Sequence, residues 1–310
     1  MNLSIVIATM NRPDAIKDLL LSLERQIYLP EEIIFIDQSK NLNTKELFDG
    51  YTVRNRSKHL TLKYILQEYP SLVKARNRGV KEASGDIVCF IDDDVILDKD
   101  YFLIIKSYFN NPIIGGVSGN VYLKENQSGI KWKVRKFLSK TFLLNNFNGK
   151  LTQSTFGYPI FEREIDAIVE VELFPGYSMN FRRELLLKNM SDEWLSGYSF
   201  REDVDLSYRI SKDAKLIMVP DARFYHNASI NNRLNQNELK KMQFKNYYYL
   251  FLKFKSKGFL SYLLFSYSIL GIIIISFLEW ILSLNSIKFS AFIADINALS
   301  LCFKGVKNER

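Results

Sequence analysis

The chain has 310 residues, of which 47% are hydrophobic and 25% are charged. This is enough for one large α/β domain with an appendage, or for two modest domains, and it excludes wholesale disorder. The two cysteines, Cys89 and Cys302, lie far apart, which argues against a secreted disulfide scaffold. No basic stretch precedes the first apolar run, so the N-terminus predicts a strand and not a signal peptide.

The net charge of +8 belongs to the C-terminal part. Residues 1–225 hold 31 Lys and Arg against 30 Asp and Glu, whereas residues 226–310 hold 11 against 4. A basic tail of this kind suits either a nucleic acid or an anionic membrane surface.

Short apolar runs alternate with helical patterns through the first 123 residues. Strands are expected at 3–9, 32–37, 60–66, 86–92 and 115–123, and helices after Pro13, at 72–84 and at 98–110. This alternation predicts right-handed βαβ units and a mostly parallel, Rossmann-like sheet flanked by helices. Ligands of such sheets bind at the carboxyl ends of the strands. Asp37 and the run from Asp92 to Asp94 lie at such ends.

The middle of the chain is less regular. A helix is expected at 201–213, followed by a strand at 215–219 that Pro220 closes. The basic, aromatic stretch 130–144 suits an amphipathic helix. Its lysines and Trp132 either contact anionic lipid or a lipid-diphosphate acceptor, or form a solvated basic face, and the sequence leaves both open.

The tail contains 20 residues without a charge, 259–278, preceded by lysines. That length is enough to cross a bilayer as a helix, so membrane contact is favoured over a buried core helix. Residues 287–303 form a weaker apolar stretch that completes a hairpin or lies flat on the membrane. We therefore expect membrane association through residues 238–303. Nucleic-acid binding is not expected, because the charges flank an apolar run.

The sharpest local signal is the run of three carboxylates, Asp92, Asp93 and Asp94, after an apolar strand. Carboxylates crowded at a strand end repel one another unless a cation neutralises them. Asp92 and Asp94 point the same way along an extended segment, which suits one Mg²⁺ or Mn²⁺ with positions left for phosphate oxygens. An acidic, solvated turn is the alternative.

Two further signals follow. Glu202 and Asp203 begin a helix, where the helix dipole also favours carboxylates in a purely capping role. His226 is one of only two histidines, and neutral imidazole is a common metal ligand. Each signal is weak alone.

Several short motifs occur in a fixed order through most of residues 3–226. They are Ala8-Thr9, Asn11-Arg12, Asp37, Ala75-Arg76-Asn77 with Gly79, Asp92-Asp93-Asp94, Gly176, Ser178-Met179-Asn180, Arg182, Glu202-Asp203 with Leu206 and Arg209, Pro220 and His226. Together they resemble the family 2 inverting glycosyltransferases, which have the GT-A fold.

The resemblance implies roles residue by residue. Asp203 would be the general base, with Glu202 beside it. The nucleotide would be bound by Thr9, Asn11, Arg12, Asp37, Arg76, Asp92 and Asp93. The metal would be held by Asp92, Asp94 and His226. The acceptor side would be formed by Gly176, Ser178, Met179 and Asn180.

One departure concerns the base. The family often carries a second acidic residue shortly after the Asp37 position, but here Gln38, Ser39, Lys40, Asn41 and Leu42 follow. UDP is favoured, and dTDP and GDP stay open.

The resemblance thus implies a Mn²⁺- or Mg²⁺-dependent enzyme that moves a sugar from a nucleotide-sugar donor to a lipid-linked or polysaccharide acceptor. Residues 1–226 would form the catalytic domain, with the nucleotide part at 1–123 and the acceptor part at 124–226. Residues 227–310 would associate with the cytoplasmic face of a bacterial inner or plasma membrane. The alternatives are a catalytically inactive membrane scaffold, a nucleotidyltransferase and a glycoside hydrolase, the last of which needs no metal.

Overall fold

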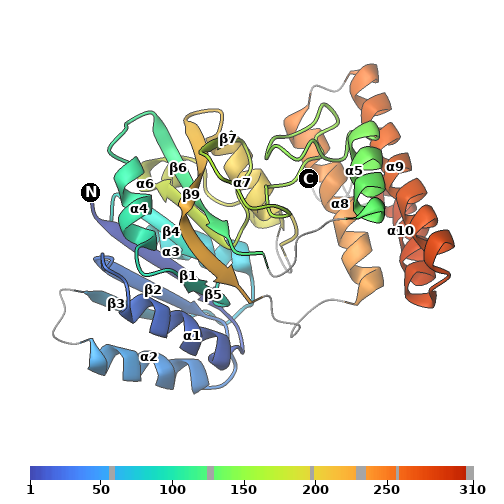
Figure 1. The fold of residues 1–310 in the computed structure, drawn as a ribbon. Coiled ribbons are helices and arrows are strands. Elements are labelled where there is room, and N and C mark those ends of the chain that lie inside the picture. Colours follow the sequence, from blue (N-terminus) through green and yellow to red (C-terminus); the bar gives the residue numbers. More distant parts are fainter. Residues whose placement is uncertain (56–59, 124–128, 196–198, 228–234, 256–257, 305–310) are drawn as a thin grey trace. The chain divides into compact units, whose positions relative to one another are not determined.

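The computed structural model describes residues 1–55, 60–123, 129–195, 199–227, 235–255 and 258–304 (Figure 1). The chain forms two compact units. The first, which we call the α/β unit, comprises residues 1–126 and 160–229, and the second, the helical unit, comprises residues 127–159 and 230–310.

The α/β unit is built on one sheet with helices on both of its faces (Figure 1). Its strands are β1 (Leu3–Thr9), β2 (Glu32–Asp37), β3 (Thr61–Leu66), β4 (Ile87–Ile91), β5 (Val95–Leu97), β6 (Ile114–Val121), β7 (Val169–Val171), β8 (Ser178–Arg182) and β9 (Lys215–His226). Its helices are α1 (Pro13–Glu24), α2 (Asn43–Arg54), α3 (Leu72–Glu82), α4 (Tyr101–Tyr108), α6 (Arg183–Lys188), α7 (Glu202–Ile210) and the 3₁₀ turn η1 (Glu193–Leu195).

The sheet is mixed and not mostly parallel as expected. The strand order is β3-β2-β1-β4-β8-β6-β9-β5, with β7 also on β9. The first four strands are parallel, but β8 is antiparallel to both β4 and β6, and β5 and β7 are antiparallel to β9. The expected parallel pairing is found in these four strands and again between β6 and β9. The apolar content of a strand does not record its direction, so the antiparallel pairs were not predicted.

Successive side chains of β1 point to opposite faces of the sheet, which explains how apolar core forms on both faces. Leu3, Ile5 and Ile7 belong to one apolar cluster, which includes the buried face of α1. Val6 points the other way, into a cluster with residues of α3 and α7. A Cβ at Gly79 of α3 would come within 2.2 Å of Val6 Cγ1, so glycine permits this close approach of helix and strand.

Strand β9 does not end at Pro220 but continues to His226. Its pairing with β6 jumps from Ser118↔Met218 to Asn120↔Arg223, so Pro220 falls in an irregular stretch of the ladder. Proline is tolerated there because no ladder hydrogen bond needs its missing N–H. The extension pairs His226 with Val95 of β5, directly after the acidic run.

The helical unit contains α5 (Ile130–Thr141), α8 (Gln236–Phe254), α9 (Phe259–Ser283) and α10 (Ser286–Lys304). The sequence-based division placed everything up to 226 in the catalytic domain, but the structure groups residues 127–159 with the C-terminal helices. The reason is local packing: Ser268 Oγ of α9 donates to the Phe142 carbonyl at 2.7 Å, and a Cβ at Gly271 would lie 2.3 Å from Phe142 Cβ.

Helix α9 is, among the described helices, the one that is long and apolar enough to cross a membrane, with a mean hydropathy of 2.1 over its most apolar 18 residues. Only 22% of that window is buried, so α9 is not the enclosed core helix of a soluble bundle. Helix α10 is different, because its fully buried Asp295 forms an ion pair at 2.8 Å with Lys240 of α8.

Candidate active site

The acidic run lies between β4 and β5, and its middle member anchors the loop after β1. Asp93 is 4% exposed; it accepts a hydrogen bond from Thr9 Oγ1 at 2.7 Å and one from Arg12 Nη1 at 3.0 Å. Burial raises the pKa of Asp93 to about 6, against the opposing pull of Arg12. Thr9, Arg12 and Asp93 are therefore brought together, and Asp93 joins the first and fourth strands.

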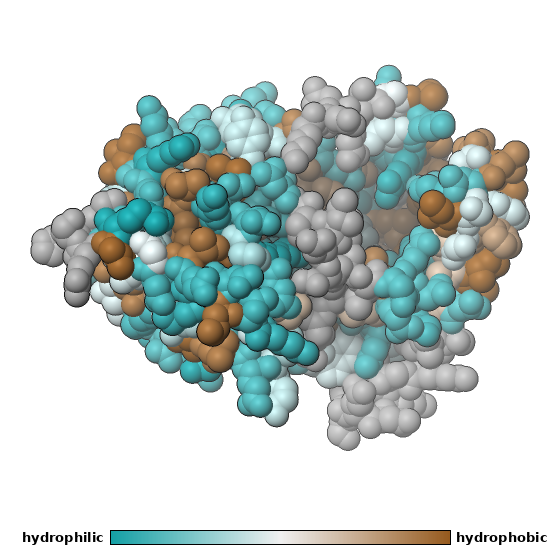
Figure 2. Space-filling view, turned by 90° about the horizontal axis from the view of Figure 1, so that it is seen from below, coloured by the Kyte–Doolittle hydropathy of each residue, from teal (hydrophilic) through white to brown (hydrophobic). Residues whose placement is uncertain are grey.

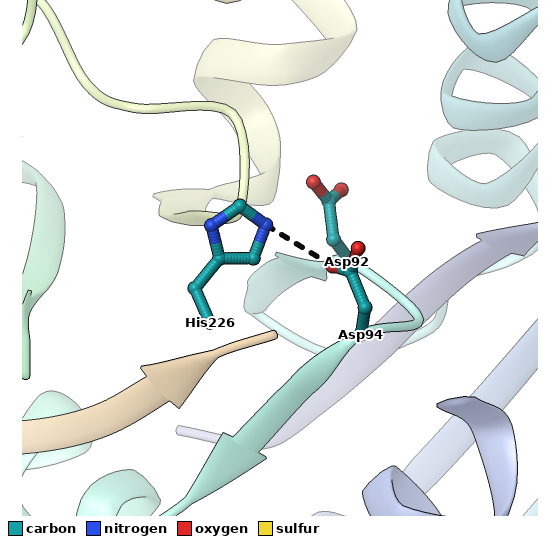
Figure 3. Close-up of side chains that lie close together, drawn as sticks. All are labelled: Asp92, Asp94 and His226. Carbon is teal, nitrogen blue, oxygen red and sulfur yellow. Dashed lines mark ion pairs between the residues drawn. The ribbon is translucent and has the colours of Figure 1, made fainter. Parts of the chain in front are cut away.

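Asp92 and Asp94 flank this anchor and lie beside His226, as Figure 3 shows. His226 Nε2 is 3.1 Å from Asp94 Oδ1. Burial alone would lower the pKa of His226, but the hydrogen bond to Asp94 and the charges of Asp94 and Asp92 outweigh it, so the pKa is raised. Arg12 Nη1 reaches Asp94 Oδ2 at 3.4 Å from the other side.

These three side chains fit a divalent cation. Each offers one ligand atom, and these atoms all lie within 4.8 Å of one another. An octahedral ion with bonds of about 2.1 Å needs neighbouring ligand atoms roughly 3–4 Å apart, so a small inward movement suffices. Two carboxylates with one imidazole suit Mn²⁺, which accepts both oxygen and nitrogen ligands.

Arg76 of α3 connects this cluster to helix α7. The side chain is 3% exposed and donates to Glu202 Oε1, to Asp92 Oδ1 at 3.1 Å and to the Gly176 carbonyl at 2.7 Å. The sequence placed Arg76 near the nucleotide. The structure shows a buried guanidinium that joins the acidic run, the turn before β8 and the start of α7.

Asp203 lies in the first turn of α7, next to that guanidinium. Its Oδ2 accepts the Gly176 N–H at 3.1 Å, and its Oδ1 accepts the Val204 N–H at 2.8 Å. Burial raises its pKa, while these N–H groups and Arg76 act in the opposite direction. Asp203 is thus held in one orientation by backbone N–H groups.

Glu202 is buried, and within the described part of the chain its second oxygen, Oε2, has no hydrogen-bond partner. Burial raises its pKa to about 7, although Arg76 pulls it down. One guanidinium faces Glu202, Asp92 and the nearby Asp203, so it does not neutralise all three carboxylates.

This shift makes stability depend on pH in a defined direction. Because the folded-state pKa of Glu202 exceeds its usual value of 4.5, folding takes up a proton between the two. The resulting stabilisation is present below pH 4.5 and is lost as the pH rises through about 7.

In chelator, we expect the melting temperature of Glu202→Gln to fall less between pH 5 and 8 than that of the wild type. The control is Glu170→Gln, at an exposed position. If the melting temperatures of all three proteins fell equally between pH 5 and 8, the raised pKa of Glu202 would be contradicted.

The nucleoside-side residues form a separate group. Asp37, fully buried at the end of β2, accepts hydrogen bonds from the Ser39 N–H at 2.8 Å and from Tyr64 Oη at 2.5 Å. Asn11 has a positive φ of 56°, and its N–H donates to Ser39 Oγ. Asn11 and Asp37 are therefore joined through Ser39, and their contact with a base stays a prediction.

The structure does not bring all acceptor-side residues to the site. Gly176 lies there, on Arg76 and Asp203, but Ser178, Met179 and Asn180 are fully buried within β8. Ser178 Oγ and Asn180 Nδ2 bond to Tyr101 Oη of α4, a helix that packs on the sheet. These three side chains therefore support the sheet below the site.

Sequence reasoning missed three tyrosines. Tyr177 packs its ring on His226 with a centroid distance of 4.7 Å, Tyr64 bonds Asp37, and Tyr101 bonds the β8 residues. Tyr177 had a signal, because it stands between Gly176 and Ser178, which both belong to the motifs of the family resemblance. Tyr64 and Tyr101 had none, since their contacts depend on strand and helix placement.

Known proteins resemble this chain in sequence and in fold. A model of the family described as glycosyl transferase family 2 matches residues 4–168, which is more than half of the chain. The poly-beta-1,6-N-acetyl-D-glucosamine synthase of Staphylococcus aureus strain MSSA476 is 31% identical over 134 residues, covering 43% of this chain and 31% of the synthase. The match thus spans about a third of that relative's length.

Among solved structures, residues 1–349 of S. aureus TarS superpose with a TM-score of 0.58 at 16% identity, over 97% of this chain and 80% of that fragment. The mannosyltransferase PcManGT of Pyrobaculum calidifontis, in complex with GDP-Man and Mn²⁺, superposes with a TM-score of 0.56 at 15% identity. The match covers 100% of this chain and 88% of the PcManGT chain. At these identities the likeness shows the fold. Sequence and fold agree: the chain belongs to glycosyl transferase family 2 and has the GT-A fold.

Proposed function

We propose that the chain is a metal-dependent, inverting glycosyltransferase that moves a sugar from a UDP-sugar to a hydroxyl of a lipid-linked or polysaccharide acceptor. The observation that carries this proposal is the buried contact network of Arg76. It ties Asp203, a carboxylate oriented by backbone N–H groups, to Asp92 of the candidate metal site. A base at Asp203 and a metal that binds the diphosphate at Asp92 would thus be coupled through one buried guanidinium.

The residues divide the reaction between them. Asp92, Asp94 and His226 would hold Mn²⁺ or Mg²⁺, which when bound supplies positive charge for the diphosphate leaving group. Asp203 accepts the proton of the acceptor hydroxyl as its oxygen attacks the anomeric carbon. The bond from that carbon to the diphosphate oxygen breaks at the same time, and one displacement inverts the configuration.

Two similar proteins support a UDP-sugar donor. TarS has been solved in complex with UDP-GlcNAc, and the name of the S. aureus synthase indicates a polymer of N-acetylglucosamine. The GDP-Man complex of PcManGT keeps GDP as the competing choice. The apolar α9 supports a location at a membrane, for which we propose the cytoplasmic face of a bacterial envelope.

The test is thermal stability of the detergent-solubilised protein with UDP, GDP or dTDP, each with Mn²⁺ or with chelator. A ligand that binds only the folded state raises the melting temperature. We expect a rise with UDP in Mn²⁺ and little rise in chelator.

The matched variant is Asp94→Asn, which keeps the size of the side chain and removes its charge. We expect this variant to lose the metal-dependent part of the rise. If no nucleotide stabilises the wild type, the transfer proposal fails and an inactive scaffold is favoured. A response to nucleoside triphosphates with release of pyrophosphate would instead identify a nucleotidyltransferase.

A further inference from the structure

The two units carry opposite charge. The α/β unit holds 25 Lys and Arg against 30 Asp and Glu, a net charge of −5. The helical unit holds 17 against 4, a net charge of +13. This net positive charge is larger than that of the C-terminal tail alone, because residues 127–159 add six cationic residues and no acidic residue.

Helix α5 supplies five of these six cations, Lys131, Lys133, Arg135, Lys136 and Lys140, and none of its residues is buried. It packs along α9: Arg135 Nε, in the middle of α5, lies 3.8 Å from Glu279 Oε1 of α9. The carbonyl of Phe142, just after the end of α5, accepts the hydrogen bond from Ser268 Oγ of α9. The segment is thus part of the surface that α9 presents.

The same helix exposes an apolar stripe. Ile130, Val134 and Phe137 recur at the spacing of one helix face and are 75%, 45% and 68% exposed. Lysines flank this stripe, and an exposed apolar face bordered by lysines is typical of helices that lie in a membrane interface.

Helix α9 continues the apolar surface. Several of its exposed apolar residues recur at the spacing of one helix face, and the turn to α10 and the first residues of α10 add more. They are Leu260, Leu263, Tyr267, Leu270, Phe277 and Ile281 of α9, followed by Leu284 and Ile287. Figure 2 shows such hydrophobic residues on the outside of the helical unit, at the right of the view. Exposed apolar surface of this extent marks a docking site.

We propose that the helical unit docks on a bilayer of anionic phospholipid, and that α5, which lies outside the C-terminal tail, is part of the docking surface. Its apolar stripe enters the interface while its lysines face lipid phosphates. The inference extends the proposed membrane location and does not depend on the transfer reaction, since lipid docking needs neither donor nor metal.

Charge favours an anionic bilayer over a second copy of the chain, and the apolar stripe favours it over a nucleic acid. Two copies of a unit with a net charge of +13 repel each other, which disfavours a second copy on this face. A nucleic acid would satisfy the lysines but leave Ile130, Val134 and Phe137 in water. An anionic bilayer satisfies both the cations and the apolar stripe.

The test is flotation of the full-length protein, after detergent removal, with vesicles of phosphatidylcholine alone or mixed with phosphatidylglycerol. We compare the wild type with a triple variant, Lys131→Gln, Lys133→Gln and Lys140→Gln. The matched control is Lys17→Gln, Lys81→Gln and Lys99→Gln, three exposed lysines of the α/β unit with the same change of charge. Each lysine near an anionic surface contributes severalfold to binding.

We expect the α5 triple variant to bind anionic vesicles at least about tenfold more weakly than the control, with a difference that shrinks in high salt. Val134→Ser with Phe137→Ser should weaken binding to both vesicle types. Equal binding of the two triple variants would overturn the proposal, as would self-association in place of vesicle binding. We expect nucleotide to raise the melting temperature of these variants as much as that of the wild type. The vesicle test can therefore fail or succeed independently of the proposed transfer reaction.

Discussion

Asp203→Asn is expected to reduce sugar transfer by about 10²–10⁴-fold while leaving nucleotide binding nearly unchanged. The amide keeps the shape of the side chain and still accepts the N–H of Gly176 or Val204, but it does not take a proton from the acceptor. Transfer is measured as release of nucleoside diphosphate with acceptor present, and binding as the melting-temperature rise in Mn²⁺.

The control is Asp213→Asn, an exposed aspartate just beyond the end of α7 that pairs with Lys188. We expect it to retain both activities. If Asp203→Asn lost nucleotide binding in parallel with transfer, Asp203 would belong to the donor site and the base would have to be sought elsewhere. If transfer survived, Glu202 would be the next candidate.

Strands β1 and β2 were predictable because each is a short, almost fully buried run rich in β-branched residues. The expected ranges 3–9 and 32–37 are the bounds of β1 and β2. Helix α2 was missed because only Thr44, Phe48 and Tyr51 face the core across its 12 residues, too weak a period to stand out.

The metal cluster was predictable for a similar reason. Asp92 and Asp94 are two positions apart at the end of a visible apolar strand, so this pair followed from a local pattern. His226 was added to the pair by the resemblance to the family, and the structure brings all three together. The network around Arg76 was not predictable, because its partners lie 16, 100 and 126 positions away. The sequence also did not show that residues 127–159 belong to the helical unit. Their place depends on contacts between distant positions, such as that of Phe142 with Ser268.

Arg76→Met is the variant for which we expect the largest loss of stability. The methionine fills similar space, but Glu202 and Asp92 lose their shared cation, and Glu202 is buried. Removing one partner from a buried ion pair costs about 3–5 kcal/mol, because the remaining carboxylate either stays charged without compensation or must take up a proton. For a unit of this size that corresponds to a fall in melting temperature of roughly 10 °C.

A second substitution separates charge from packing. If the loss arises from the uncompensated carboxylate, adding Glu202→Gln to Arg76→Met should restore part of the stability, since the amide carries no charge to bury. Arg76→Lys should be intermediate, because an ammonium retains the charge but does not reach Glu202, Asp92 and Gly176 with one planar group. Equal melting temperatures for Arg76→Met and the double variant would mean that packing, not charge, holds α3 to α7. In that case the link from the acidic run to Asp203 would be steric, and the position of the base would not depend on the charge of Arg76.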